Sequence, residues 1–298
     1  MGRRGESPLP AHADQETVRV AAVPTADPVK VLRLPDGSGR SILDTRWFPW
    51  VVRLSSMVVL LGVWEVVGRR QETTLFFVPL SQVLVALWEL IQTQEFWAAY
   101  GQTIIPFLWG WILALVVGIG VGLVIGRFRP IMQLTSPYLT FLNALPVSTL
   151  VPVAVILLGI GYPSRILVVF LFAVVEITLN TAAGVRYVDR DYIEMGRSFK
   201  ATEWRLFRKV ILPASAPGIM AGVRIGTGRA VVGMVVVEIL LVAVGVGRLI
   251  LRYRGRFQSD NLYAVVLSLI IFGIVLLAVA KRVERRVSKW KYELEAVL

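Results

Sequence analysis

The residue types that proteins use for covalent or metal chemistry are nearly missing from this chain. Its 298 residues include no cysteine and one histidine, His12. Without a thiolate or a cluster of imidazoles, nucleophilic and metal catalysis have no obvious residues to act through. The remaining candidates for chemistry are charged side chains inside apolar segments. Glu176 is one of them, and Glu238 shares an apolar segment with Arg224 and Arg229.

Charges inside apolar segments have two interpretations. An unpaired charge at the centre of a bilayer costs at least about 2.5–3.5 kcal/mol, so the two glutamates either pair with arginines between helices or line a path for a solute. Polar residues beside Pro146 favour a path, because a proline frees a backbone carbonyl, but such residues also form hydrogen bonds between helices. The residues predicted to line the path are Asn143, Pro146, Ser148, Thr149, Glu176, Asn180 and Glu238.

The composition indicates an integral membrane protein that positions these groups on membrane helices. The chain is 56% hydrophobic and 17% charged, with a mean hydropathy of +0.68. Its net charge of +12 raises the possibility of nucleic-acid binding. However, the Lys and Arg residues flank apolar runs, as they do where they set membrane topology. A membrane protein that does not bind nucleic acid is therefore expected.

The chain divides into three regions by composition. Residues 1–45 are polar and rich in Pro and Gly, which predicts a disordered tail, and no apolar stretch of signal-peptide length follows Met1. Residues 46–280 form the predicted six-helix domain, and residues 281–298 form a basic tail. The six segments predicted to span an all-α membrane fold are Phe48–Gly68, Gln102–Gly126, Met132–Ile160, Arg165–Tyr187, Pro217–Val246 and Leu262–Ala280.

The distribution of positive charge predicts that both termini are cytoplasmic. The two tails and the segment from Arg186 to Lys209 carry most of the 32 Lys and Arg residues, and all three then lie inside. The stretch "GRLILRYRGRF", residues 247–257, is an exception, because it places four arginines in an outer loop. These arginines either interact with lipid headgroups or attract an anionic solute or an acidic partner.

Two patterns predict how the helices pack. Glycines spaced four residues apart leave one face of a helix without side chains, so another helix can approach closely. They are Gly118, Gly122, Gly126, Gly218, Gly222 and Gly226. Between the first two spans, "VPLSQVLVALWELIQTQEFW" carries a helical apolar stripe too short to span, which predicts an interfacial helix.

The charged stretch "EMGRSFKATEWRLFRKVILP", from Glu194 to Pro213, interrupts two apolar segments. Residues 193–199 predict one short helix. In a second helix, the spacing of Trp204, Phe207, Val210 and Ile211 predicts a single apolar face. Two short amphipathic helices with aromatic side chains suit docking into a groove on a soluble partner.

This stretch resembles the EAA loop of permease subunits of bacterial ABC importers. Glu194, Met195 and Gly196 stand at its Glu-Ala-Ala positions, and the ending matches at Leu212 and Pro213. Lys200 stands where the family usually has glycine, so the geometry of the local turn is open to question. "NALPVSTLVPVAVILLGIG" and "VVVEILLVAVGVGRLI" are similar to the third and fifth spans of these permeases. The similarity covers roughly residues 47–280 and is strongest to nitrate, sulfonate and taurine importers.

The resemblance implies a non-enzymatic permease subunit in the bacterial inner membrane. Two copies, or a copy and a close relative, would form the pathway, and an extracytoplasmic binding protein would deliver the solute. ATP and Mg²⁺ would be bound by a separate cytoplasmic ATPase, because this chain contains no Walker A sequence. The predicted ATPase-coupling residues are Glu194, Met195, Gly196, Phe199, Lys200, Ala201, Trp204, Phe207, Leu212 and Pro213.

Two other classes of protein fit parts of the sequence. An intramembrane enzyme would need a positioned base or nucleophile pair, which the apolar segments do not offer. A channel or secondary transporter would account for the spans and leave the docking pattern of the charged stretch unexplained. The solute itself is not determined by the sequence, although the outer arginines favour an anion.

Overall fold

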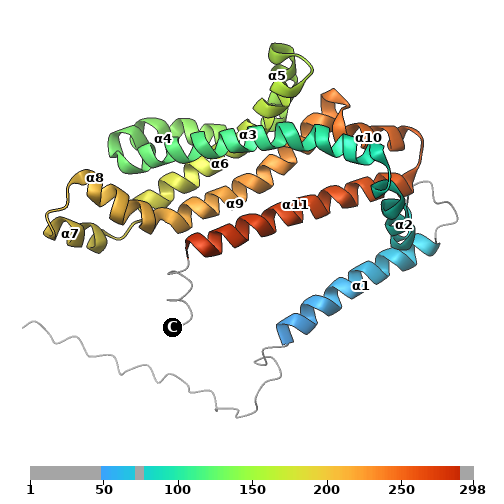
Figure 1. The fold of residues 1–298 in the computed structure, drawn as a ribbon, viewed down its shortest axis with the longest axis horizontal. Coiled ribbons are helices and arrows are strands. Elements are labelled where there is room, and N and C mark those ends of the chain that lie inside the picture. Colours follow the sequence, from blue (N-terminus) through green and yellow to red (C-terminus); the bar gives the residue numbers. More distant parts are fainter. Residues whose placement is uncertain (1–47, 71–76, 289–298) are drawn as a thin grey trace, which may run out of the picture. The chain divides into compact units, whose positions relative to one another are not determined.

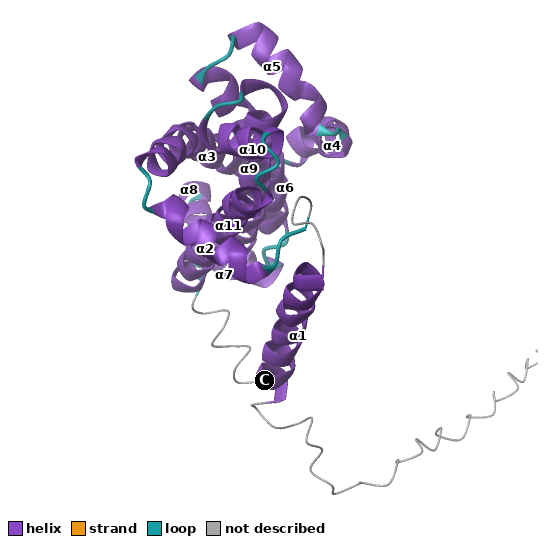
Figure 2. Ribbon diagram, turned by 90° about the vertical axis from the view of Figure 1, so that its right-hand side faces the viewer, coloured by secondary structure: helices purple, strands orange, loops and turns teal. Residues whose placement is uncertain are grey.

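The computed structural model describes residues 48–70 and 77–288, apart from the side chains of residues 48, 49, 241 and 242. Within these ranges every regular element is helical, which confirms the all-α prediction (Figures 1 and 2). In chain order, the elements are α1 (Phe48–Arg70), α2 (Leu80–Ile91), α3 (Gln94–Arg127), α4 (Arg129–Ala144), η2 (Val147–Thr149), α5 (Leu150–Leu158), α6 (Tyr162–Arg186), α7 (Arg190–Ser198), α8 (Glu203–Leu206), η3 (Phe207–Ile211), α9 (Leu212–Val237), η4 (Glu238–Val242), α10 (Gly245–Gly255) and α11 (Ser259–Val287).

The chain forms two compact units, residues 1–55 and 56–298. The first is described only from residue 48 onward, as the first turns of α1, so the predicted tail over residues 1–45 lies outside the described residues. The second unit contains the rest of α1 and all the other described elements. Its helix α11 continues to Val287, beyond the predicted end of the domain at residue 280, and residues 289–298 lie outside the described part.

Four described helices are each long and apolar enough to cross a membrane, namely α1, α3, α6 and α11. The predicted third and fifth spans are broken. A bend of 76° separates α4 from η2 and α5, and a bend of 50° separates the run ending at residue 240 from α10. The total reaches the predicted six if each bent pair counts as one span.

The two breaks have identifiable causes in the backbone. Pro146 follows α4 and has no N–H with which to continue the helical hydrogen bonds. After α9, the π-helical segment η4 ends at Ala243, whose φ of 40° is left-handed. The stretch "GRLILRYRGRF", which was predicted to be an outer loop, lies after this break and is mostly helical, as part of α10.

Helix α6 packs between α3 and α9, and the two glycine stripes make both contacts close (Figure 1). A Cβ added at Gly218 would lie 2.5 Å from the Cα of Gly184 on α6. A Cβ at Gly122 would lie 2.6 Å from the Cβ of Thr181. The other four predicted glycines also face atoms of α6 at less than 3.0 Å. The prediction of close helix packing is confirmed.

An apolar core separate from these glycine contacts joins α2, α3, α10 and α11. Val83, Ala86 and Leu90 of α2 are buried in it beside Val246 and Leu249 of α10. The indole N–H of Trp64 donates to the carbonyl of Val78 at 3.0 Å, just ahead of α2. The helix expected to lie at the membrane interface thus packs its apolar stripe against this core.

Candidate functional site

The charged stretch singled out in the sequence folds as a helical hairpin made of α7, α8 and η3. Each arm begins with a side-chain cap. Asp189 accepts a hydrogen bond from the N–H of Asp191, and Thr202 accepts one from the N–H of Arg205 at 3.4 Å. Such caps satisfy N–H groups that have no partner inside the helix. The sequence therefore fixes where both helices begin.

Lys200 makes the turn between the two arms with a left-handed backbone, φ 51°. Its N–H donates to the carbonyl of Arg197 at 2.8 Å, and the next N–H, of Ala201, donates to Gly196 at 3.3 Å. A left-handed conformation costs a non-glycine residue about 1–2 kcal/mol. The lysine therefore adopts the conformation for which a glycine is suited, and the turn is retained.

The arms of the hairpin pack on a small core. Leu206 is 1% exposed and Ile211 is 5% exposed, and both belong to one buried cluster with Val185 in the last turn of α6 and Val188 just after it. A Cβ at Gly196 would lie 2.5 Å from Cδ1 of Leu206, so the absence of a side chain at this position lets α7 approach α8. This core attaches the hairpin to a membrane helix.

The buried face of the second arm includes three of the four predicted apolar residues: Ile211 is buried, and Phe207 and Val210 pack against the same core. Trp204, the fourth, is 68% exposed, and Leu206, which was not predicted, is buried. The segment η3 is π-helical, and in it the N–H of Leu212 bonds to the carbonyl of Phe207. This wider turn brings Leu206 and Ile211, five residues apart, into one core, which a period of 3.6 does not predict.

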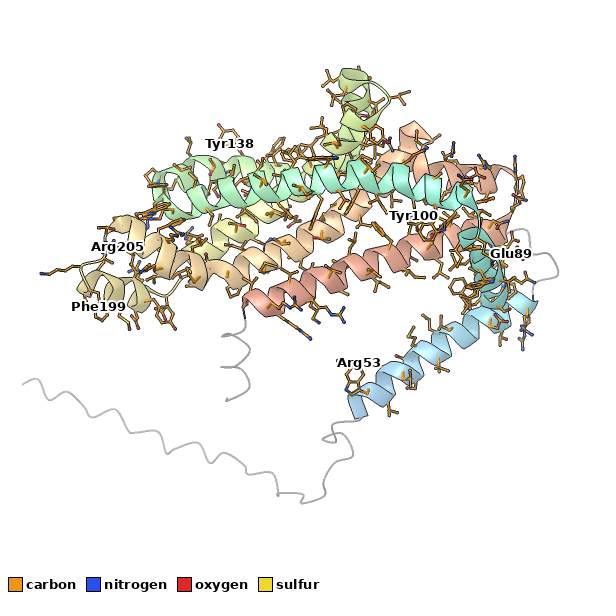
Figure 3. All side chains as sticks on the ribbon, viewed as in Figure 1. Arg53, Glu89, Tyr100, Tyr138, Phe199 and Arg205 are labelled. Atoms are coloured by element: carbon orange, nitrogen blue, oxygen red, sulfur yellow. The ribbon has the colours of Figure 1, made fainter. Side chains whose placement is uncertain are left out.

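Large apolar side chains on the hairpin point away from its core. Met195 is 58% exposed, Phe199 is 82% exposed, and the ring of Trp204 stacks on Phe207 with centroids 6.2 Å apart. Figure 3 shows Phe199 at the free end of the hairpin. A hollow of about 440 Å³ lies between α7 and the start of α9. The predicted coupling residues that line it are Met195, Gly196, Phe199 and Pro213.

The other predicted coupling residues lie close by. Glu194 is exposed on α7, and its carbonyl accepts a hydrogen bond from the hydroxyl of Ser198 at 3.0 Å. Ala201 and Leu212 are partly buried at the two ends of the α8–η3 arm. The ten predicted residues thus belong to one continuous piece of structure.

Four of the seven predicted pathway residues meet in a cavity of about 190 Å³ at the bend between α4 and η2. They are Asn143, Pro146, Ser148 and Glu176. Arg229 of α9 also lines this cavity, and its Nη2 lies 3.1 Å from Oε1 of Glu176 on α6. The arginine side chain is 58% exposed and the glutamate side chain 15%. Residues that are distant in the sequence therefore form one polar site.

The sequence matches one protein family over more than half of the chain. Residues 114–289, which include the hairpin and the cavity lining, match the family described as "Binding-protein-dependent transport system inner membrane component". The chain belongs to this family of ABC importer permeases. The permease is 26% identical over 249 residues to the aliphatic sulfonates transport permease protein SsuC of Bacillus subtilis, a match that covers 83% of this chain and 90% of the relative.

Two further similarities support this assignment. The nitrate import permease protein NrtB of Synechocystis sp. is 32% identical to the permease over 166 residues, which is 56% of this chain and 59% of the relative. Among solved structures, a chain of the MetNI methionine ABC transporter in an inward-facing conformation has a TM-score of 0.53 at 20% identity. That match covers 67% of the permease and 97% of the solved chain and shows a shared fold.

The remaining three predicted pathway residues of the permease lie outside the cavity lining. The Thr149 hydroxyl donates to the carbonyl of Pro146 at 2.8 Å. Asn180 donates to the carbonyl of Glu176 at 2.8 Å, and its Cβ faces Gly222 of α9. Glu238 is 1% exposed in a separate polar network.

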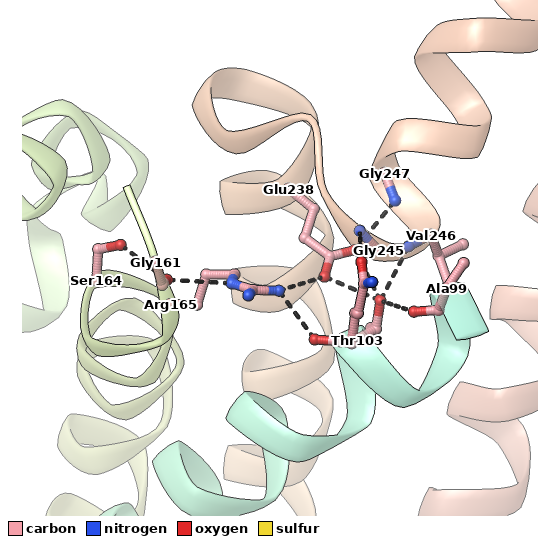
Figure 4. A network of polar contacts seen from close by, with 10 residues as sticks. Ala99, Thr103, Gly161, Ser164, Arg165, Glu238, Gly245, Val246 and Gly247 are labelled. Carbon is pink, nitrogen blue, oxygen red and sulfur yellow. Dashed lines mark hydrogen bonds and ion pairs between the residues drawn. The ribbon is translucent and has the colours of Figure 1, made fainter. Parts of the chain in front are cut away.

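The Glu238 network of the permease joins α3, α6 and the start of α10 (Figure 4). The carboxylate of Glu238 accepts hydrogen bonds from Thr103 at 2.9 Å and from the N–H of Gly247 at 3.0 Å, and lies 3.5 Å from Arg165. Arg165 also donates to the carbonyl of Gln102 at 2.9 Å. Of the two interpretations open for Glu238, its geometry matches an arginine-paired acid between helices. The partner is Arg165, the first residue of the predicted fourth span.

Two further arginines of the described permease helices are paired. Arg224, considered as a partner for the acids, instead pairs with Glu284 of α11 at 2.8 Å. In α10, Arg252 pairs with Glu95 at the start of α3. This pair accounts for one of the four arginines that had appeared to violate the topology rule.

Proposed function

We propose that the permease is one membrane half of an ATP-driven importer for small inorganic or organic anions. A solute-binding protein delivers the anion from outside the cell, and the anion passes between two permease halves. A cytoplasmic ATPase, which binds ATP and Mg²⁺, supplies the energy. Both termini and the α7–α8 hairpin lie on the cytoplasmic side, in agreement with the positions of Lys and Arg.

The observation that carries the coupling proposal is the hairpin with an anchored core and exposed aromatic side chains. Leu206 and Ile211 fix the hairpin to the end of α6, while Phe199 and Trp204 remain exposed. Exposed aromatic residues on a short helix are suited to a groove on a partner protein. Motion of that partner would pass through the anchored core to the membrane helices.

The proposal of a second permease copy rests on Arg229. The side chain of Arg229 is more than half exposed, and the residue lies in α9, which belongs to one of the two bent span candidates. A charge facing lipid at this depth is unfavourable, so this face of α9 requires a polar or protein neighbour. A symmetric pair of identical chains would supply such a neighbour and would enclose the cavity.

The proposed solute class rests on the relatives and on the cavity. SsuC and NrtB are described as permeases for sulfonates and nitrate, which are both anions. The cavity contains an arginine together with the amide of Asn143 and the hydroxyl of Ser148, and all three can donate hydrogen bonds to an anion.

The test is to purify the tagged permease in a mild detergent and to determine the mass and stoichiometry of the proteins bound to it. We expect two permease copies with two ATPase subunits, and ATP turnover that rises when an extracytoplasmic binding protein is added. A permease recovered without an ATPase, even after crosslinking through Lys200, would contradict the proposal. It would favour a channel or a secondary transporter.

A further inference from the structure

The pair formed by Arg229 and Glu176 is open to the cavity on one side, unlike the other pair buried among the helices. In the Arg165–Glu238 pair both side chains are at most 3% exposed, and the carboxylate also accepts hydrogen bonds from Thr103 and Gly247. That network is closed (Figure 4). In contrast, Arg229 remains 58% exposed beside its carboxylate partner.

Arg229 has hydrogen-bonding capacity beyond its ion pair. The contact with Glu176 engages one nitrogen, Nη2, whereas a guanidinium carries five N–H donors in a planar fork. This fork fits planar and tetrahedral oxyanions. Asn143 and Ser148 line the same cavity from the bend between α4 and η2.

We propose that Arg229 recognises the transported anion and that Glu176 is its internal counter-ion, which the anion partly displaces. This inference rests on the proposed function and assigns its specificity to one pair of side chains. With no anion present, Glu176 compensates the charge of Arg229 inside the membrane region. When an anion arrives, it competes with this carboxylate for the guanidinium, so binding is weak and release is rapid.

The absence of cysteine from the chain allows a direct test, because one introduced thiol is then the only one. Ser148→Cys places this thiol in the cavity lining, and Ser136→Cys places one on an exposed part of α4 outside the lining. Each full-length variant is prepared in membrane vesicles. The thiol is labelled with two methanethiosulfonate reagents of similar size, one carrying a sulfonate and the other a quaternary ammonium group. The same cysteine thiolate attacks both reagents, forming a mixed disulfide and releasing methanesulfinate, so the ratio of the two labelling rates cancels differences in thiol ionisation.

We expect the sulfonate reagent to be favoured at position 148 by about threefold or more, relative to its ratio at position 136, because the exposed N–H groups of Arg229 that Glu176 leaves unengaged attract an anion. Arg229→Gln should abolish or reverse this preference, because Glu176 is then the only charged residue that lines the cavity, and Arg229→Lys should retain part of it. Glu176→Gln should increase the preference and should let millimolar nitrate slow the labelling. Arg224→Gln, which alters the pair with Glu284, should leave the preference unchanged.

The proposal is overturned if Arg229→Gln leaves the ratio at position 148 unchanged while position 136 is labelled normally. It is also overturned if neither reagent reaches position 148. Labelling requires neither the ATPase nor the binding protein. If the Ser148→Cys permease shows the preference for the sulfonate reagent but binds no ATPase, only the coupling proposal is contradicted. If it binds its ATPase but shows no such preference, only the anion site is contradicted.

Discussion

The carboxylate of Glu203 in the first turn of α8 pairs with the guanidinium of Arg127 in the last turn of α3. Arg197 of α7 lies 3.5 Å from the other oxygen of the same carboxylate. Glu203 therefore connects both arms of the hairpin to a second membrane helix, in addition to the core that connects them to α6. The hairpin is held at two points, so it can transmit force to both helices.

Reversing the charge of either Arg127 or Glu203 should weaken this transmission with little effect on folding. Exposed ion pairs contribute only about 0.2–1 kcal/mol to stability. We expect Arg127→Glu and Glu203→Arg each to lower transport per ATP hydrolysed, while thermal stability stays nearly unchanged. The double variant should restore part of the coupling, and not all of it, because Arg197 would then face an arginine. Transport and ATP hydrolysis are measured together in proteoliposomes, and a double variant no better than either single variant would contradict a role for the pair.

The left-handed turn predicts a stabilising substitution. Lys200→Gly should raise the stability of the hairpin, since glycine adopts φ 51° without the cost of about 1–2 kcal/mol that other residues bear. Ala201→Gly is the matched control, because its backbone is not left-handed and it should gain nothing. Limited proteolysis of the hairpin measures the effect. Equal cleavage rates for Lys200→Gly and the original chain would show that the turn is not strained.

The glycine stripes predict opposite effects of one substitution at two positions. Gly218→Ala should destabilise the helix bundle by about 1–3 kcal/mol, because the new methyl group meets the backbone of Gly184, which cannot move aside alone. At Gly120 of α3 a Cβ would meet nothing within 4 Å, so Gly120→Ala should leave stability unchanged or raise it. Thermal unfolding in detergent compares them. Similar losses at both positions would mean that α6 and α9 do not pack as described.

The buried pair of Arg165 and Glu238 predicts a non-additive double-mutant cycle. Removing one partner leaves an uncompensated buried charge, at a cost of about 3–5 kcal/mol. Arg165→Met and Glu238→Gln should each lower the apparent melting temperature strongly, and the double variant should lose less than the two losses combined. Additive losses would show that the two side chains do not interact.

The sequence predicted well those features that depend on local pattern. Glycines spaced four apart marked the faces by which α3 and α9 meet α6. Features that depend on backbone irregularity were missed. Hydropathy registers composition and not direction, so the bends after Ala144 and near Ala243 were not predicted. In the hairpin, the π-helical segment η3 adds Leu206 to the buried face, and Trp204, which was predicted to lie on that face, is exposed.

Ion pairs between residues far apart in the chain were the other features that the sequence did not predict. Arg165 begins a predicted span, and nothing in the sequence around it points to a partner, but in the fold it lies in the first turn of α6 and faces Glu238. No local pattern relates residues so far apart in the chain. Arg229 and Glu176 were both noticed in the sequence, and it took the fold to place them beside Asn143 and Ser148 in one cavity.

Coupling through the hairpin is the central claim, and a site-specific photocrosslink tests it most directly. A photoreactive amino acid replaces Phe199 at the exposed end of the hairpin or, as a control, Tyr138, which is 66% exposed on α4 (Figure 3). The account predicts that position 199 crosslinks to an ATP-hydrolysing subunit in membranes and that position 138 does not. Active importer complexes in which position 199 crosslinks only to lipid, or to no protein, would contradict it.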